Sequence, residues 1–526
     1  MARGGAIVAC LGVCAAACAP RGAPPAGRQL VADRTSVPIG VVRSDGDGIT
    51  RVLVTRPDGD GQSADLYVVS VDATGAPPVE RLLAAGLPAG FTLNCQPGPY
   101  ACTDARGRLI AYLGNDPTSG YNELARLDPV TGARVDFGAV FFHELSPSGE
   151  RLIIDTDPMS GSATLYDADD RVIQLAVATN GPNFVFVGEV LYYLDAQQEL
   201  MGLAVGGSPE LVTTGISLLT SWPQQTTGDP LLALGRPTAD PRTPALSILD
   251  TVTGSETSLP VGTAVHSFTL SPDGRWIVTF DGRPNGVTFT DLSEGVPDSI
   301  PTNVTADTLQ WRPGHDEIWL SNGQDQDSES SFWINKPGAD PVEIPGFQSA
   351  LMDDAGQYTT FTADGAAWFS WKDPLDDHPL VQVGLGDDPT GPRFDLAPAG
   401  ATVTQYWEVA DGRILAPAFT TTATRSNIYA VDPATGDSSV LGEEGAVVAV
   451  GQTRLLVNQH VLDNEGDLTV FELGTARSTV LALEFTLAAF VEPVGGDAVA
   501  PGAHVAFQFQ ARFPSPYDGI WLATVP

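Results

Sequence analysis

The chain has 526 residues, with 27 lysines and arginines against 64 aspartates and glutamates, so its formal net charge is −37 at pH 7. This balance excludes nucleic acid as a partner and disfavours anionic membrane surfaces, because phosphate binding needs clustered basic residues. Two interpretations of the acidity stay open: solubility or adaptation to salt, and binding of cations or basic partners.

The first 18 residues have the pattern of an export signal. Arg3 gives a positive start, residues 6–17 form an apolar stretch too short to span a bilayer, and residues 15–17 are the small residues of a cleavage site. Cys18 follows, and this arrangement resembles the lipobox of bacterial lipoproteins, in which that cysteine is lipidated. Ala15 stands where the lipobox usually has leucine, and ordinary secretion is the alternative. The resemblance implies an exported protein, anchored to a membrane through Cys18 and facing the periplasm or the cell surface.

Residues 19–35 are rich in proline, glycine and alanine and lack periodicity, which predicts a flexible tether. Residues 36–526 alternate short apolar runs with Gly, Pro, Asp and Asn clusters, without a long amphipathic helical pattern. This alternation is typical of many antiparallel strands joined by tight turns. We therefore expect one all-β region after the tether.

Two cysteines in the expected mature chain, Cys95 and Cys102, bracket a Pro-Gly-Pro turn. In an oxidising compartment such a pair can close a short loop, so we predict a disulfide between them. Free thiols are the alternative, and a metal site is disfavoured because no histidine lies near the two cysteines.

Two turn motifs recur along the all-β region. Asp-x-x-Thr-Gly occurs at residues 128–132, 250–254 and 432–436, with a shortened copy at 72–75, and Ser-Pro-x-Gly occurs at 146–149 and 271–274. Proline and glycine supply the dihedral angles that such hairpins need. The first motif is expected between the third and fourth strands of a four-stranded module, and the second between the first and second strands.

The modules start near residues 50, 103, 144, 183, 228, 268, 305, 352, 405, 446 and 489. Their mean length of about 44 residues fits a four-stranded propeller blade. The predicted fold is therefore an all-β propeller of four-stranded antiparallel blades. Eleven modules exceed the four to eight blades of a typical ring, which leaves one large ring with insertions or, slightly favoured, two propellers in tandem. Residues 37–42 are expected to pair with the last strand, near residues 517–525, and so close a ring.

The combination of Ser-Pro-Asp-Gly turns, apolar strands and Asp-x-x-Thr-Gly turns resembles the TolB-like and WD-repeat-like β-propellers of bacterial envelope proteins. The resemblance covers most of residues 50–525, and the turns at 146–149 and 271–274 carry it best. It implies a propeller that works through protein contacts or ligand binding at its faces. Fold resemblance at this level implies no particular activity.

Motifs of propeller enzymes are missing from the sequence. Quinone-dependent propellers have tryptophan four residues after the glycine of Asp-x-x-Thr-Gly, where this chain has Asp136, Ser258 and Val440. The Ser271–Trp276 turn has the wrong spacing for a sialidase, and the Gly-x-Ser-x-Gly pentapeptide of appended hydrolase domains is missing. We therefore predict no catalytic, cofactor-binding or metal-binding residue.

Three weaker features leave a functional alternative open. His143 and His266 precede the Ser-Pro turns, where their side chains could face a central channel or simply pack against it. Acidic loops at residues 45–48 with 58–61 and at 325–329 suggest structural calcium or solvated turns. Residues 368–371 (Trp-Phe-Ser-Trp) fit a buried core or an aromatic surface patch for sugar or protein.

The sequence favours a non-catalytic binding module of the bacterial cell envelope, with a partner that is an envelope protein, a glycan or a small ligand. The alternative is a propeller-fold glycosidase or lyase whose catalytic carboxylates come from separate blades and leave no local motif. Converging carboxylates, arginine and histidine with perturbed pKa values would favour the enzyme, and a flat apolar face would favour binding.

The substitution Cys18→Ala is expected to release the protein from the membrane fraction, because the lipid attachment atom is lost. Cell fractionation followed by immunodetection measures the distribution. An unchanged membrane fraction would contradict the lipid anchor.

Overall fold

The computed structural model describes residues 24–43, 48–59, 61–72, 74–88, 91, 103–115, 119–157, 159–167, 169–179, 184–221, 231–237, 245–258, 267–271, 275–280, 287–292, 299–301, 308–322, 330–334, 339–344, 347–348, 351–352, 358–371, 381–385, 391–398, 401–403, 405–420, 426–433, 435–442, 445–462, 465–473, 475, 477–491, 499–510 and 515–526. Cys18, Cys95, Cys102, His266 and the acidic run at 325–329 lie outside these residues. In the described residues all regular secondary structure is β-strand, and a search of them finds no helix able to span a membrane.

The described strands form antiparallel sheets that follow the chain order and that we group into eleven blades. Blade 1 contains β2 (Val37–Arg43), β3 (Thr50–Pro57), β4 (Ser63–Val71) and β5 (Val79–Pro88); blade 2 contains β6 (Leu109–Asn115), β7 (Asn122–Leu127) and β8 (Arg134–Val140); blade 3 contains β9 (Phe142–Leu145), β10 (Arg151–Asp155), β11 (Ser162–Asp167) and β12 (Val172–Ala176); blade 4 contains β13 (Phe184–Val187), β14 (Val190–Leu194), β15 (Leu200–Leu203) and β16 (Glu210–Thr213). Blade 5 contains β17 (Leu218–Ser221), β18 (Leu231–Arg236), β19 (Ala245–Asp250) and β20 (Glu256–Ser258); blade 6 contains β21 (Ser267–Leu270), β22 (Trp276–Phe280), β23 (Val287–Asp291) and β24 (Ser299–Pro301); blade 7 contains β25 (Thr308–Trp311), β26 (Ile318–Asn322), β27 (Ser330–Ile334) and β28 (Val342–Ile344).

The last blades are less regular than the first ones. Blade 8 contains β29 (Phe347–Gln348), β32 (Ala367–Trp371), β33 (Val381–Leu385) and β34 (Arg393–Asp395), with a separate hairpin of β30 (Leu351–Met352) and β31 (Tyr358–Thr359); blade 9 contains β35 (Ala401–Val403), β36 (Trp407–Glu408), β37 (Ile414–Thr420), β38 (Ser426–Val431) and β39 (Ser438–Gly442). One seven-stranded sheet makes up blades 10 and 11 and contains β40 (Ala446–Val450), β41 (Arg454–Leu462), β42 (Glu465–Glu472), β43 (Ser478–Val491), β44 (His504–Phe509), β45 (Gly519–Thr524) and β1 (Arg28–Val31). β43 belongs to both blades, because its first part pairs with β42 and its second part with β44.

The turn motifs lie where the sequence predicts them. The four Asp-x-x-Thr-Gly turns connect β4 to β5, β7 to β8, β19 to β20 and β38 to β39, which are third-to-fourth-strand hairpins. In the complete copies the glycine N–H donates to the carbonyl of the first aspartate at 2.8 Å. The Ser-Pro turn at residues 146–149 connects β9 to β10, so it is a first-to-second-strand hairpin. The predicted four-stranded propeller blades are therefore confirmed.

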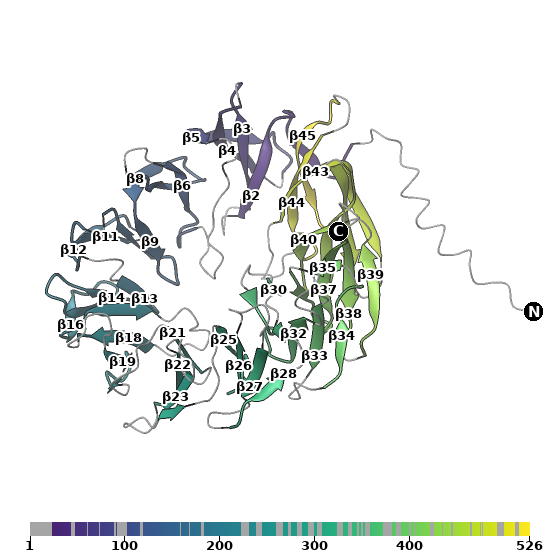
Figure 1. Ribbon diagram of the computed structural model, residues 1–526. Coiled ribbons are helices and arrows are strands. Elements are labelled where there is room, and N and C mark those ends of the chain that lie inside the picture. Colours follow the sequence, from purple (N-terminus) through teal and green to yellow (C-terminus); the bar gives the residue numbers. More distant parts are fainter. Residues whose placement is uncertain are drawn as a thin grey trace, which may run out of the picture.

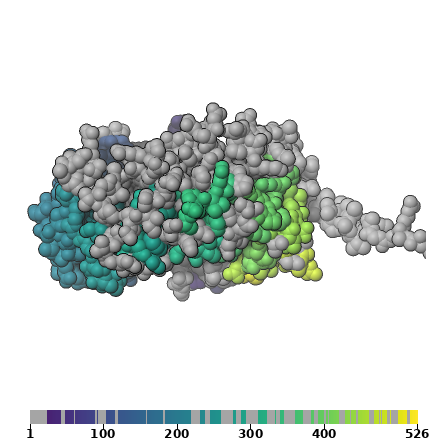
Figure 2. Space-filling model, turned by 60° about the horizontal axis from the view of Figure 1, so that its bottom comes forward, coloured from purple at the N-terminus to yellow at the C-terminus, as the bar shows by residue number. Residues whose placement is uncertain are grey.

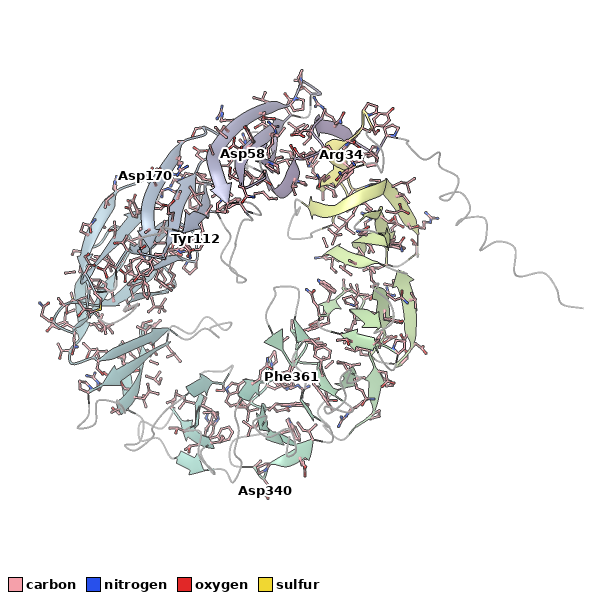
Figure 3. The ribbon with its side chains drawn as sticks, turned by 45° about the horizontal axis from the view of Figure 1, so that its top comes forward. Arg34, Asp58, Tyr112, Asp170, Asp340 and Phe361 are labelled. Atoms are coloured by element: carbon pink, nitrogen blue, oxygen red, sulfur yellow. The ribbon has the colours of Figure 1, made fainter. Side chains whose placement is uncertain are left out.

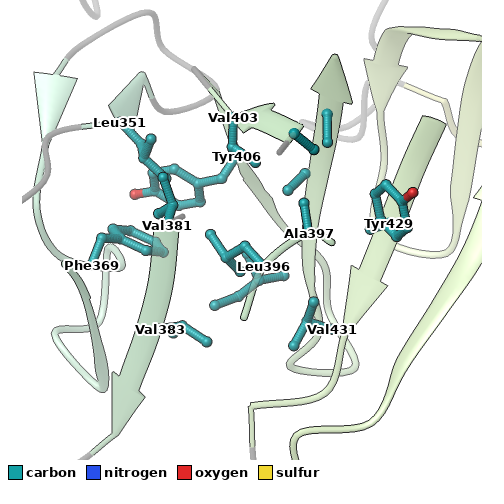
Figure 4. Packing of buried hydrophobic residues seen from close by; sticks show 14 of the residues in the cluster. Leu351, Phe369, Val381, Val383, Leu396, Ala397, Val403, Tyr406, Tyr429 and Val431 are labelled. Atoms are coloured by element: carbon teal, nitrogen blue, oxygen red, sulfur yellow. The ribbon is translucent and has the colours of Figure 1, made fainter. Parts of the chain in front are cut away.

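The apolar core lies between blades as well as within them. Strand side chains alternate between the two faces of a sheet, so each blade presents an apolar face to both neighbours. Figure 4 shows one such cluster, in which Phe369 and Val383 of blade 8 pack with Leu396, Tyr406 and Val431 toward blade 9. All five side chains are buried. A blade on its own would leave these faces in water, so the blades depend on one another for stability.

The blades follow one another around a ring (Figure 1). The first strand of each regular blade lies toward the centre of the ring and the fourth toward the rim. In the space-filling view the blue and teal blades lie at one end of the body and the light green and yellow blades at the other (Figure 2). The ring closes because β2 packs against β43 and β44.

Blade 11 is closed by a different N-terminal segment from the one that the sequence predicts. β1 pairs antiparallel with β45, with Arg28 opposite Leu522 and Val31 opposite Ile520. Residues 37–42 instead belong to β2 and pair with β3. The predictions of a tether throughout residues 19–35 and of closure by residues 37–42 are therefore wrong, because residues 28–31 supply the missing fourth strand.

The aromatic run at residues 368–371 is not a surface patch in the part that the structure describes. Trp368 is 1% exposed and Phe369 is fully buried. Trp368 packs against Trp319 of blade 7 with ring centroids 4.7 Å apart, so it belongs to the core between blades 7 and 8. Large flat side chains fill the space between blades here, as the core interpretation of the sequence predicts.

Gly519→Ala is expected to destabilise the protein by disturbing the pairing of β1 with β45. A Cβ atom at residue 519 would lie 1.9 Å from the carbonyl oxygen of Val31, so the backbone must shift at a cost of roughly 1–3 kcal/mol. Gly502→Ala is the matched control, because Gly502 also has positive φ (+86°) but has no atom within 4 Å of its would-be Cβ. Urea unfolding of both variants tests ring closure, and equal losses would contradict it.

Candidate binding pocket between blades 2 and 3

Two hairpins of blade 2 form one side of a charged pocket. In the hairpin that precedes β6, Asp104 Oδ1 accepts hydrogen bonds from the backbone N–H of Arg106 at 2.9 Å and of Arg108 at 3.0 Å. Gly107 takes the left-handed position of this turn, with φ of 73°. The turn points the two arginine side chains toward blade 3, where Arg106 pairs with Asp169.

The second hairpin is the Asp-x-x-Thr-Gly turn between β7 and β8. Asp128 Oδ1 accepts hydrogen bonds from the backbone N–H of Val130 at 2.7 Å and of Thr131 at 3.0 Å, and the Thr131 hydroxyl donates to Oδ2 at 2.5 Å. Burial acts to raise the pKa of Asp128, but these hydrogen bonds outweigh burial and lower the pKa below its usual value. Asp128 is therefore an ionised carboxylate near neutral pH and is unsuited to act as a general acid.

The arginines of the pocket are held by carboxylates from both blades. Asp104 Oδ2 accepts from Arg108 Nε at 2.6 Å, and both oxygens of Asp170 accept from Arg108 Nη1 at 3.0 and 3.1 Å. Arg126, on β7, pairs with Asp170 as well, and its guanidinium lies over the ring of Phe137 at 5.6 Å. The side chains of Arg108 and Arg126 are only 11% and 3% exposed. Burial lowers the pKa of Arg126, and the neighbouring Arg108 adds to this effect.

These groups surround a cavity of about 340 Å³. Its charged lining is Arg106, Arg108, Arg126, Asp128 and Asp170, and its remaining lining is Val130, Thr131, Ala133 and Val135. A concave site with a few convergent polar groups and an apolar wall is typical of small-molecule binding.

A second group of titratable side chains lies near the inner strands. The Tyr112 hydroxyl on β6 and His143 Nδ1 on β9 share a hydrogen bond of 2.8 Å, and their rings meet edge to face. The next residue, Glu144, points to the opposite side of β9 and accepts a hydrogen bond from the backbone N–H of Phe186 at 3.3 Å. Burial lowers the pKa of His143, whereas burial raises the pKa of Glu144 to about 7. Figure 3 shows Tyr112 toward the inside of the ring and Asp170 farther out.

The described histidines are not brought together. His315 lies 4.0 Å from Glu317, and His504 Nδ1 lies 3.3 Å from the Thr50 hydroxyl. Within the described residues, His, Cys, Asp and Glu form no group of three or more that could hold a metal ion. The acidic run at 325–329, where calcium was considered, lies outside those residues.

Sequence reasoning missed the pocket. Arg106, Arg108 and Arg126 belong to no motif, and the paired carboxylates of Asp169 and Asp170 follow in the next blade. The spacing of the three arginines gives no signal either, since three arginines are closer together at positions 43, 51 and 56.

Comparisons with known proteins bear on the fold alone. No family model matches the chain, and no curated protein matches it. Among solved structures, dipeptidyl peptidase 4 of Porphyromonas gingivalis is 11% identical over 93% of this chain and 66% of that chain, with a TM-score of 0.34. The β-propeller domain of the Trilobed protease from Pyrococcus furiosus is 12% identical over 64% of this chain and 95% of that chain, with a TM-score of 0.26. An oligogalacturonate lyase in complex with manganese is 12% identical over 80% of this chain and 96% of that chain, with a TM-score of 0.26.

The strand order and the blade geometry define the protein as an all-β propeller. Its described residues include a charged pocket between two adjacent blades.

Glu144→Gln is expected to stabilise the protein more at pH 8 than at pH 5. Burial raises the folded-state pKa of Glu144 from 4.5 to about 7. The stability associated with the neutral side chain is therefore fully present below pH 4.5 and is lost as the pH rises through 7, because the buried carboxylate is then charged. The loss is at most roughly 3.5 kcal/mol, since one pKa unit corresponds to about 1.4 kcal/mol. Urea unfolding of wild type and variant at both pH values measures the difference.

The exposed Glu123 on β7 supplies the control variant Glu123→Gln. A stability difference between wild type and Glu144→Gln that is the same at pH 5 and pH 8 would contradict the raised pKa.

Proposed function

We propose that the protein is an exported, lipid-anchored β-propeller that acts as a non-catalytic binding module of the bacterial cell envelope. The pocket between blades 2 and 3 is its recognition site, and the partner is a small ligand or a projecting group of an envelope protein or glycan. The observation that carries this proposal is the presence of three arginines around one cavity of about 340 Å³. The charges come from two blades, so the pocket exists only in the folded ring.

The ionised state of Asp128 and the ion pairs of the arginines favour binding over catalysis at this pocket. A general acid needs a pKa raised toward the working pH, whereas the pKa of Asp128 is lowered. The arginine side chains are fixed by carboxylates before any ligand arrives, as in the ion pairs of Arg108 with Asp104 and Asp170. Preorganised charged groups of this kind lower the entropic cost of binding.

Glu144 is the one observation that favours the alternative, a propeller-fold glycosidase or lyase. A carboxyl group with a pKa of about 7 is suited to exchange protons near neutral pH. Glu144 does not line the charged pocket, so an enzyme of this kind would use a different site between blades 3 and 4.

Arg106→Gln is expected to reduce partner capture several-fold, because this half-exposed arginine lines the pocket and its loss leaves the core untouched. Arg134→Gln is the matched control, since Arg134 is exposed on β8 of the same blade and does not line the pocket. Cross-linking in intact envelopes, followed by affinity capture, measures recovery of the partner.

Equal recovery with Arg106→Gln and Arg134→Gln would contradict the pocket as the recognition site. Turnover of a glycan by the wild-type protein, lost in Glu144→Gln, would favour the enzyme instead.

A further inference from the structure

The turn between β11 and β12 holds an aspartate in a backbone conformation that glycine usually takes. Asp170 has φ of 63°, and it shares this positive sign with Gln198 alone among the described non-glycine residues. In three other hairpin turns of blades 2 and 3 the residue with this conformation is glycine: Gly107, Gly132 and Gly149 have φ of 73°, 75° and 72°. Left-handed backbone costs a non-glycine residue free energy, and such strain is common at functional sites.

The conformation of Asp170 directs its carboxylate into the pocket of the neighbouring blade. The carboxylate meets Nη1 of Arg108 with both oxygens and also pairs with Arg126. Asp170 itself is 47% exposed, whereas the side chains of Arg108 and Arg126 are 11% and 3% exposed. A half-exposed anion therefore pairs with two buried cations.

The two arginines keep other support when Asp170 is removed. Asp104 holds Nε of Arg108 at 2.6 Å, and Phe137 lies under the guanidinium of Arg126. Among the described residues, Arg126 Nε has no hydrogen-bond partner. A buried guanidinium with a free donor retains the capacity to bind a second acceptor group.

We propose that Asp170 occupies the position of a ligand carboxylate, and that the ligand of this pocket is a small molecule or chain end that carries one carboxylate beside a short apolar group. This inference rests on the proposed function of the pocket. The ligand carboxylate displaces Asp170 and pairs with Arg108 and Arg126, while the apolar group contacts Val130, Ala133 and Val135. At about 30 Å³ per water-sized group, the cavity holds roughly ten non-hydrogen atoms.

Asp170→Gly tests the displacement directly. Glycine suits φ of 63° and removes the competing carboxylate, so the variant is expected to bind isobutyrate and N-acetyl-L-valine at least tenfold more tightly than wild type. Isobutyramide, which lacks the charge, is expected to gain nothing. Isothermal titration calorimetry of the full chain measures all three affinities. Tighter binding of isobutyrate would indicate a free acid as the ligand, and tighter binding of N-acetyl-L-valine would indicate a peptide C-terminus.

Gln198→Gly is the matched control, because it relieves the same backbone conformation (φ of 60°) in blade 4 without changing a charge. Its carboxylate affinities are expected to equal those of wild type. Asp170→Asn keeps the size of the side chain and removes its charge, so it should reproduce the gain of Asp170→Gly.

The inference is overturned if Asp170→Gly and Asp170→Asn bind the acids no more tightly than wild type, or if isobutyramide gains as much as isobutyrate. If the acids bind no more tightly but Arg106→Gln still reduces partner capture, the pocket remains the recognition site and only the assignment of a carboxylate ligand fails. When Arg106→Gln also captures the partner normally, both proposals fail.

Discussion

The ring depends on contacts between neighbouring blades, and at several junctions these join the first hairpin of one blade to the blade that follows. Neighbouring blades bury each other's apolar faces, but apolar packing has no direction, and hydrogen bonds are needed to fix the position of one sheet on the next. Arginines near the first hairpin supply many of these bonds to backbone carbonyls of the following blade. The observed pairs are Arg151 Nη1 with Leu203 at 3.0 Å, Arg312 Nε with Gly365 at 2.6 Å and Arg413 Nη2 with Leu473 at 3.2 Å.

The pocket is a local variant of the same contact. Between blades 2 and 3 the backbone bond is present, from Ala105 N–H to the Gly149 carbonyl at 3.0 Å, but the arginines meet carboxylates in place of carbonyls. Arg312 and Arg413 also pair with carboxylates, but these are Glu317 and Asp411 of their own blades. Arg108 and Arg126 pair with Asp170 of the following blade, and a guanidinium paired with a half-exposed carboxylate can exchange it for another anion. In the function that we propose, this joint between blades 2 and 3 is also the ligand-binding site.

The repeat and its phase could be predicted from the sequence because Asp-x-x-Thr-Gly and Ser-Pro-x-Gly encode local turn geometry. Spacing alone also located the start of the weak module near residue 183, where β13 lies, but the start expected near 228 falls at β18, the second strand of blade 5. The closing strand was misplaced because β1 (Arg-Gln-Leu-Val) is short and half polar, whereas β2 has the more apolar pattern, and only the ring decides which of them meets β45. The pocket was missed for a related reason, since Arg126 and Asp170 become neighbours only when blade 3 packs on blade 2.

The pairing of β1 with β45 has a consequence for the order of folding. Arg28 lies opposite Leu522, and Gln29 Nε2 donates to the carbonyl of Asp518 at 2.8 Å across 489 positions of sequence, so this pairing joins residues near the two ends of the described chain. Local hairpins and neighbouring blades form with far smaller losses of chain entropy, and the closure comes after them. Until it occurs, the growing ring is an open arc whose edge at β45 is unpaired and available to other chains. The lifetime of that arc, more than the stability of the closed ring, determines how long the protein is exposed to aggregation while it folds.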